Sequence, residues 1–307
     1  MLDLEARIGD VVLPNPVMTA SGTAGHGDEL KAYLDLSELG AVVVKSVSAK
    51  PWKGNPAPRL HPVAAGMMNA VGLQNPGVDE WLAKELPPLA ARGARVIASI
   101  WGFSVEDYEA AADALASCGP EVVAVEVNLS CPNVEDRRQM FAHDPVRAAA
   151  AIAATAGCGR PRWAKLSPNV TDVVSIAGAV LEAGASAVTL INTVMGLAID
   201  PATGKPRLGN GGGGLSGSAI RPVAVRAIYD VRAAYPSAAI VGVGGVESGE
   251  TAAELLAAGA NAVQVGTATF ADPRAPIRVL RDLAAWCATN GVRNLDDLVG
   301  RAHRVAE

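Results

Sequence analysis

Residues 240–270 have the sequence IVGVGGVESGETAAELLAAGANAVQVGTATF, which carries the main signal for the fold class. An apolar run rich in β-branched residues at 240–244 is followed by an Ala- and Leu-rich segment with helical spacing, and a second apolar run spans 262–265. Gly259 stands where that helix should stop. The pattern predicts two parallel strands joined by a helix, which is the repeating unit of α/β proteins.

The same alternation recurs along the chain. Eight short apolar runs, each followed by a longer helical segment, predict the strands 17–20, 42–45, 96–100, 122–128, 164–166, 187–191, 240–244 and 262–265. Eight such units in about 250 residues are typical of a closed (β/α)8 barrel, or TIM barrel. A doubly wound open sheet is the alternative α/β fold. We therefore expect residues 1–307 to form a single barrel domain.

Three segments lie outside these units. The opening stretch LEARIGDVVLPNPV (4–17) predicts a β-hairpin that plugs the barrel floor, because Pro14 and Pro16 would interrupt a helix. Long inserts at 46–90 and 195–222 follow strands, so they should lie at the C-terminal face, where the functional loops of such barrels belong. Within the second insert, the glycine-rich run 210–214 is predicted to be a mobile loop rather than a linker between domains.

The composition limits the partners. Half of the 307 residues are apolar and the formal net charge is −5, so the chain offers no basic surface for nucleic acid. The first residues, MLDLEARIGD, lack the apolar core of a secretion signal, and no run reaches the roughly 18 apolar residues that span a bilayer. We expect a cytoplasmic protein without a membrane partner.

The four cysteines are scattered and form no CxxC pair, so their spacing predicts neither a zinc site nor an iron–sulfur cluster. Cys118, Cys158 and Cys287 fall in helical segments or at their ends, where a cysteine is ordinarily a small buried side chain. Cys131 instead follows a predicted strand within NLSCPNV (128–134), where a thiol could face a ligand. None of the four histidines ends a strand, which argues against a Ser/His/Asp hydrolase and against a histidine-bound metal.

Polar and glycine residues end the predicted strands, and in a (β/α)8 barrel the chemistry sits at those ends. Any one of them is most often a cap or turn residue, but together they indicate a binding site. These residues are Ser21, Gly22, Lys45, Ser46, Ser99, Asn128, Cys131, Lys165, Asn192, Thr193, Gly244, Gly245, Gly266 and Thr267.

Two lysines among these residues predict the charge of the ligand. Lys45 and Lys165 should point into one barrel mouth, and buried ammonium groups need anionic or electron-rich partners. The glycine turns GVGG and VGTA, after the last two strands, predict a phosphate site built from backbone N–H groups. A Rossmann fingerprint is excluded, because Glu247 stands where its third glycine would be needed.

Several motifs, spread in order over nearly the whole chain, together resemble class 1 dihydroorotate dehydrogenases, and more closely class 1B. They are KSVSAKPWKGNPAPRL (45–60), NAVGLQNPG (69–77), NLSCPNV (128–134), INT (191–193), NGGGGLSGSAIRP (210–222), VGVGG (241–245) and VGTA (265–268). The resemblance implies an FMN-binding (β/α)8 barrel that oxidises dihydroorotate to orotate in de novo pyrimidine biosynthesis. It also implies that Cys131 is the base that takes the C5 proton, while hydride leaves C6 for the flavin N5.

The resemblance further implies two overlapping sets of site residues. The substrate set is Lys45, Asn69, Ala70, Val71, Gly72, Leu73, Asn128, Asn192 and Thr193. The FMN set is Ser21, Lys45, Ser46, Ser99, Asn128, Lys165, Ile191, Gly217, Gly244, Gly245, Gly266 and Thr267. The chain departs from the family where Ser99 replaces a frequent Asn, where Ser218 replaces a frequent Pro, and in the charged stretch EDRRQMFAHD (135–144).

The route by which electrons leave stays open at this point. The sequence has no second redox centre, so class 1B resemblance implies a homodimer joined by a separate FAD and iron–sulfur subunit that passes electrons to NAD, as a heterotetramer. Direct reduction of fumarate, as in class 1A, is one alternative. Another dihydropyrimidine as substrate is a second alternative. A third is an RNA-modifying flavoprotein or a barrel that only binds phosphorylated ligands, and the acidic charge disfavours RNA.

Overall fold

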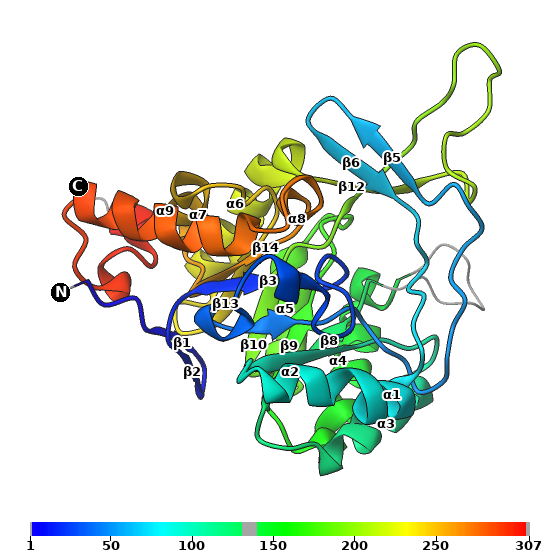
Figure 1. Ribbon diagram of the computed structural model, residues 1–307, viewed down its shortest axis with the longest axis horizontal. Helices are drawn as coiled ribbons and strands as arrows, with labels where there is room; N and C mark the ends of the chain where they lie inside the picture. Colours follow the sequence, from blue (N-terminus) through cyan, green and yellow to red (C-terminus); the bar gives the residue numbers. More distant parts are fainter. Residues whose placement is uncertain (1, 131–139, 305–307) are drawn as a thin grey trace.

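The computed structural model describes residues 2–130 and 140–304, and its centre is a parallel eight-stranded barrel (Figure 1). Neighbouring strands follow the order β3-β14-β13-β10-β9-β8-β7-β4. Their bounds are β3 Val17–Thr19, β4 Val42–Val43, β7 Val96–Ile100, β8 Val122–Asn128, β9 Arg162–Lys165, β10 Ala187–Leu190, β13 Ile240–Val243 and β14 Ala262–Val265. The eight predicted strands are all present, which confirms the α/β barrel.

Hydrogen bonds join β3 to β4 and to the residues just before β4, so the two ends of this order close the barrel. The Gly40 N–H donates to the Val17 carbonyl at 2.9 Å, and the Thr19 hydroxyl donates to the Val43 carbonyl at 3.1 Å. An open doubly wound sheet would leave its two edge strands apart. The closure therefore excludes that alternative.

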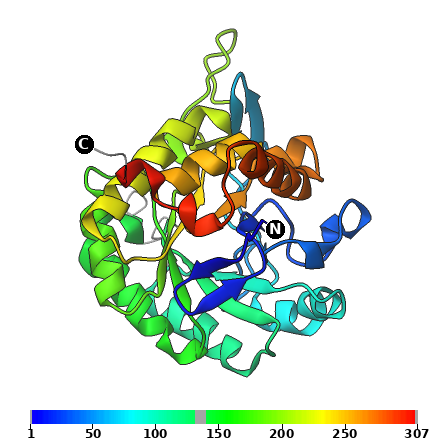
Figure 2. The same cartoon turned by 90° about the vertical axis from the view of Figure 1, so that its left-hand side faces the viewer.

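Helices surround the barrel (Figure 2). The α-helices are α1 Val78–Glu80, α2 Leu86–Ala91, α3 Val105–Ala114, α4 Pro145–Ala154, α5 Val173–Glu182, α6 Arg221–Ala234, α7 Gly249–Ala258, α8 Ala268–Ala271 and α9 Ala275–Thr289, and a π-helical segment, η3 Trp81–Glu85, joins α1 to α2. Side chains of Ser104, Asp144, Asp172 and Ser248 cap the first turns of α3, α4, α5 and α7. Gly259 ends α7 with a φ of 127°, as predicted.

Short 3-10 helices complete the connections. They are η1 Glu29–Ala32, η2 Leu36–Glu38, η4 Leu115–Ser117, η5 Phe141–His143, η6 Thr155–Cys158, η7 Ser218–Ile220, η8 Leu295–Asp297 and η9 Arg301–His303. Of the helices in the described residues, none has both the length and the apolar character needed to cross a membrane. The described residues also hold no cluster of three or more side chains suited to bind a metal ion.

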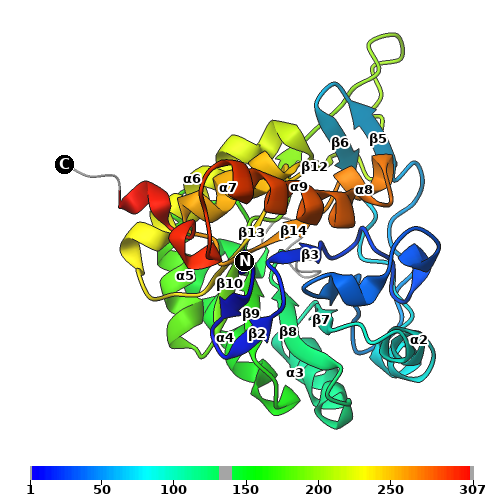
Figure 3. The same cartoon turned by 60° about the vertical axis from the view of Figure 1, so that its left-hand side comes forward.

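The predicted N-terminal hairpin is present and lies at the N-terminal end of the barrel (Figure 3). Its strands β1 Ala6–Ile8 and β2 Val11–Leu13 pair antiparallel, and Ile8 and Leu13 are fully buried. Gly9, in the turn, packs so closely that a Cβ there would lie 3.1 Å from the carbonyl oxygen of Ser186, just before β10. The hairpin therefore closes the barrel floor.

The two long inserts contribute a second sheet, which the sequence did not predict. Its four antiparallel strands, in the order β11-β12-β6-β5, are β5 Leu60–Val63, β6 Gly66–Asn69, β11 Val194–Gly196 and β12 Gly213–Ser216. The prediction of a mobile loop at 210–214 is wrong for Gly213 and Gly214, because both belong to β12. These glycines have little intrinsic strand preference, and pairing with β6 and β11 holds them extended.

Candidate active site

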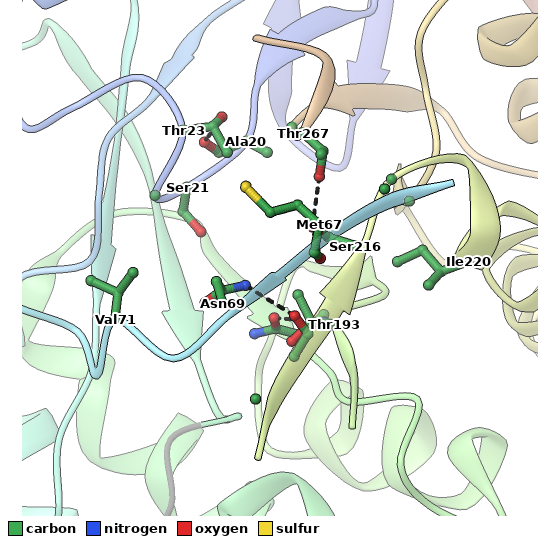
Figure 4. Close-up of a pocket in the computed structure, with 18 of the residues that line it drawn as sticks. Ala20, Ser21, Thr23, Met67, Asn69, Val71, Thr193, Ser216, Ile220 and Thr267 are labelled. Atoms are coloured by element: carbon green, nitrogen blue, oxygen red, sulfur yellow. Dashed lines mark hydrogen bonds between the residues drawn. The ribbon is translucent and has the colours of Figure 1, made fainter. Parts of the chain in front are cut away.

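A cavity of about 630 Å³ opens between the C-terminal ends of the barrel strands and the four-stranded sheet. Its wall contains eighteen of the residues that the sequence placed in a site: Ser21, Gly22, Lys45, Asn69, Ala70, Val71, Gly72, Leu73, Asn128, Lys165, Ile191, Asn192, Thr193, Gly217, Gly244, Gly245, Gly266 and Thr267. In Figure 4, Ser21, Asn69, Val71, Thr193 and Thr267 lie around this cavity, with Asn69 and Thr193 on one side and Thr267 on another. One space therefore joins the predicted substrate and flavin residues.

Ser46 and Ser99 do not reach the cavity wall. Both are buried, and their hydroxyl groups lie 2.8 Å apart beneath Asn128. The Asn128 amide donates to Ser46 Oγ at 3.3 Å, and its Oδ1 accepts from the Asn192 amide at 3.3 Å. The two serines thus support a cavity residue, and their predicted contact with flavin stays a prediction.

Cys131 lies outside the described residues. Ser130 and Met140, the described residues on either side of 131–139, both line the cavity. Tyr108 holds the strand that leads to this segment, because its hydroxyl donates to the Asn128 carbonyl at 2.7 Å. The Tyr108 ring also packs edge-on against Phe141, with 5.2 Å between ring centroids.

Lys165 forms an ion pair inside the protein. Its Nζ lies 3.1 Å from Glu126 Oε1 and 2.9 Å from Ser21 Oγ, and both charged side chains are buried. The sequence predicted that the ligand would supply the anion for Lys165, but the protein itself supplies it. Glu126 was missed, although a lone acidic residue within the apolar strand VVAVEVN could have indicated it.

Unlike Lys165, Lys45 forms no ion pair with another of the described residues. Burial and then the charge of Arg59 lower the Lys45 pKa to about 8. Its neighbour His26 has a pKa lowered to about 4 by burial and then by the Lys45 charge. An anionic ligand in the cavity could therefore pair with Lys45, whose charge no carboxylate of the described residues neutralises.

The loop from Ala70 to Leu73 presents its backbone to the cavity in a fixed shape. The side chain of Asn55 donates to the Ala70 carbonyl at 3.2 Å, and that of Asn75 donates to the Leu73 carbonyl at 2.9 Å. Leu73 has a φ of 59°, a left-handed conformation that is costly for a residue with a side chain. Such a conformation is typical of ligand-binding loops.

Glycines form the opposite end of the cavity. Gly217, Gly244 and Gly245 have φ values of 100°, 135° and 70°. A Cβ on Gly245 would lie 2.6 Å from the Cβ of Arg221, so the backbone there must stay bare. Bare backbone N–H groups at such turns suit a phosphate.

Aromatic side chains at the cavity wall were also missed. Trp52 and Phe103 line it and pack edge-on at 5.1 Å, and Phe103 packs on the buried Trp101 at 4.6 Å. Their positions in loops after strands gave no periodic signal, and only the fold brings them together.

Comparison with known proteins gives one consistent result. The family model described as "Dihydroorotate dehydrogenase" matches residues 3–286. The chain is 43% identical over 299 residues to the "Dihydroorotate dehydrogenase B (NAD(+)), catalytic subunit" of Geobacter metallireducens, covering 97% of each chain. It is 47% identical over 298 residues to the protein of the same name from Desulforudis audaxviator, covering 97% of this chain and 96% of that one. It is also 45% identical over 298 residues to a "Putative dihydroorotate dehydrogenase A (fumarate)" of Solibacter usitatus, covering 97% of each.

Proposed function

Because the chain belongs to the dihydroorotate dehydrogenase family, we propose roles in that reaction for the residues of the cavity. The protein is an oxidoreductase that acts on dihydroorotate in pyrimidine biosynthesis, and its family uses a flavin. We assign the whole chain to a single flavin-binding domain, in which the barrel carries the site and the four-stranded sheet covers it. The observation that carries the assignment is Lys45, a cation without a carboxylate partner among the described residues, in an apolar cavity lined with amide groups.

FMN is the flavin that the donor set fits. Gly217, Gly244, Gly245 and Gly266 bring bare backbone to one end of the cavity, as a phosphate requires. Ile191 and Val243 add apolar surface to the cavity wall. Lys165 and Ser21 then supply hydrogen-bond donors for the polar edge of the flavin ring. When bound, FMN supplies the acceptor for the hydride of the substrate.

Dihydroorotate would bind between Lys45 and the amide side chains. Lys45 pairs with its carboxylate, while Asn69, Asn128 and Asn192 donate to or accept from its ring carbonyl and N–H groups. The hydrogen bonds from Asn128 to Ser46 and from Asn192 to Asn128 fix these amides before the substrate arrives. Cys131 would then take the C5 proton as its thiolate.

A separate electron-transfer subunit is the proposed route for the electrons. The catalytic subunits from Geobacter and Desulforudis carry names that specify NAD(+) as acceptor. We propose that a homodimer of this chain passes electrons to NAD through a subunit with FAD and an iron–sulfur cluster. The Solibacter relative, named for fumarate, keeps direct fumarate reduction as the second candidate.

The test is anaerobic mixing of FMN-loaded protein with dihydroorotate. Rapid bleaching of the oxidised-flavin absorbance supports the assignment, whereas bleaching by dihydrouracil but not by dihydroorotate would assign another dihydropyrimidine. The reduced enzyme is then offered fumarate or an NAD-linked partner subunit. Reoxidation by fumarate alone at catalytic rates would overturn the electron-transfer proposal without affecting the substrate.

A further inference from the structure

A charged network lies beneath the proposed flavin site, and the roles proposed for the cavity residues use its lysine but not its carboxylate. Lys165 Nζ lies 3.1 Å from Glu126 Oε1, and the other oxygen of that carboxylate accepts from Gln264 Nε2 at 2.6 Å. We propose that Glu126 is a positioning residue that holds Lys165 in a neutral ion pair and thereby lowers the reduction potential of the bound flavin. The inference rests on the proposed function, because it requires FMN above Lys165.

The network leaves Lys165 one exchangeable hydrogen bond. Its ammonium group has three N–H bonds, and three acceptors surround it: Ser21 Oγ at 2.9 Å, Glu126 Oε1 at 3.1 Å and Gln264 Oε1 at 3.4 Å. Of the three acceptor residues, only Ser21 lines the cavity. A ligand can therefore replace Ser21 while the other two bonds hold the ammonium toward it.

The carboxylate also changes the charge that a ligand meets. Glu126 is fully buried on β8, the Lys165 side chain on β9 is 5% exposed, and Gln264 is fully buried on β14. Among the described residues this is the one ion pair with both side chains buried. In such surroundings charges interact strongly, and the carboxylate opposes the stabilisation that Lys165 alone would give an anionic reduced flavin.

Stability alone does not account for the pair. A buried ion pair loses hydration on folding, and an apolar pair of similar size is often equally stable. A purely structural pair would also leave the flavin potential unchanged when the carboxylate is neutralised. The potential is therefore the quantity that separates the two roles.

The experiment measures the potential of FMN bound to the full-length protein, by equilibration with a redox dye. In Glu126→Gln we expect the ratio of reduced to oxidised flavin at a fixed ambient potential to rise about tenfold, which is about 30 mV for a two-electron couple. Glu126→Asp, which keeps the charge, should restore the wild-type ratio. A rise of less than about threefold in Glu126→Gln, about 14 mV, would overturn the proposal.

A second variant covers the case in which Glu126→Gln leaves an unpaired buried ammonium and does not fold. The double variant Glu126→Gln with Lys165→Gln replaces the ion pair by neutral amides. If the charges of Glu126 and Lys165 cancel at the flavin in the wild type, removing both should keep the ratio of reduced to oxidised flavin within about threefold of the wild-type ratio. A larger fall would mean that Lys165 acts as an uncompensated cation, and the proposal would fail.

The dye measurement needs no substrate, so the two proposals fail separately. Wild-type protein that binds FMN but is not reduced by dihydroorotate contradicts the proposed function. Wild-type protein that is reduced, together with an unchanged potential in Glu126→Gln, contradicts only the role of Glu126.

Discussion

The hydroxyl groups of Ser46 and Ser99 lie 2.8 Å apart beneath the cavity, although 53 residues separate them in the chain. Ser46 follows β4, Ser99 lies in β7, and these strands are neighbours in the barrel. Ser46 also accepts a hydrogen bond from the Asn128 amide. Two small hydroxyl groups therefore fix the orientation of an amide that faces the proposed substrate.

Removing these hydroxyl groups should affect substrate binding unequally. Ser46→Ala removes the acceptor of Asn128 directly, and a lost hydrogen bond of about 1 kcal/mol corresponds to a rise of roughly fivefold in KM for dihydroorotate. Ser99→Ala leaves that acceptor in place and should change KM by less than about twofold. Steady-state kinetics of the two variants checks the order. A larger effect in Ser99→Ala would contradict the support that we assign to Ser46.

The barrel was predictable because its strands are apolar runs at regular intervals, and periodicity alone marks them. The strands β7 Val96–Ile100 and β8 Val122–Asn128 have the predicted bounds. The four-stranded sheet was not predictable in this way, since β12 is the glycine-rich GGLS. It exists because the fold brings β6 beside it, 145 residues away at the pair Asn69 and Gly214.

The site was predictable to the extent that its residues end strands. Lys45, Asn128 and Lys165 all stand at such ends and line one cavity. Glu126 and Gln264 lie within strands, and whether a strand residue points into a barrel or onto a helix depends on the closure of the barrel. Glu126 meets Lys165 from the neighbouring strand β8, and Gln264 meets it from β14 across the barrel. No spacing in the sequence encodes either contact.

Lys45 predicts how substrate affinity depends on pH. Its pKa is lowered to about 8 by burial and then by Arg59, so the free enzyme loses this cation as the pH rises above about 8. Affinity for the dihydroorotate carboxylate should be full below pH 8 and fall by up to about tenfold for each pH unit above it. Lys45→Arg keeps its charge throughout and should flatten KM between pH 7.5 and 9.5, about the range over which the wild type changes. A wild-type KM that is constant over this range would contradict the role of Lys45.

His26 predicts a loss of stability in acid. Its folded pKa is about 4, lowered by burial and then by Lys45, whereas an unfolded histidine titrates near 6.5. The unfolded chain therefore binds the proton first, and stability present above pH 6.5 is lost as the pH falls toward 4. The difference of about 2.5 pKa units corresponds to at most about 3.4 kcal/mol, and partial exposure of the ring should reduce it to roughly half.

The His26 contribution is measured by urea unfolding of wild type and His26→Gln. The stability difference between the two proteins at pH 7.5 sets the baseline, and the variant should gain on the wild type by about 1 to 2 kcal/mol at pH 5. A difference that is the same at both pH values would show that His26 titrates alike in the folded and unfolded chain.

Cys131 predicts the rate of flavin reduction. A serine hydroxyl ionises far less readily than a thiol, whose reference pKa is about 8.5, so Cys131→Ser should slow reduction by dihydroorotate at pH 7 by about 100-fold or more. FMN should stay bound, because the side chain acts on the substrate. Stopped-flow reduction measures the rate, and Cys118→Ser is the matched control at a thiol outside the cavity wall. Equal rates in Cys131→Ser and wild type would remove the cysteine from its role.

Alanine substitutions at two glycines of the cavity should distinguish an effect on stability from an effect on FMN binding. Gly245 has a φ of 70°, and a Cβ there would lie 2.6 Å from Arg221 Cβ, so Gly245→Ala should destabilise the apoprotein by about 2 kcal/mol. Among the described residues, a Cβ on Gly266 would meet Ala20 Cβ at 3.4 Å and Thr23 Cγ2 at 3.9 Å, and both are ordinary contacts. Gly266→Ala should therefore fold with a stability within about 0.5 kcal/mol of wild type.

The added methyl group of Gly266→Ala should nevertheless weaken the binding of FMN. Gly266, Ala20 and Thr23 all line the cavity, so the methyl group occupies its wall where the proposed phosphate site needs bare backbone. We expect the Kd for FMN to rise about tenfold, a loss of about 1.4 kcal/mol in binding free energy. Fluorescence titration of the apoprotein measures the Kd, and urea unfolding of the same sample measures stability. If Gly266→Ala bound FMN with wild-type affinity, the phosphate would not bind beside β14. A stability loss equal to that of Gly245→Ala would mean that both glycines are needed for the fold.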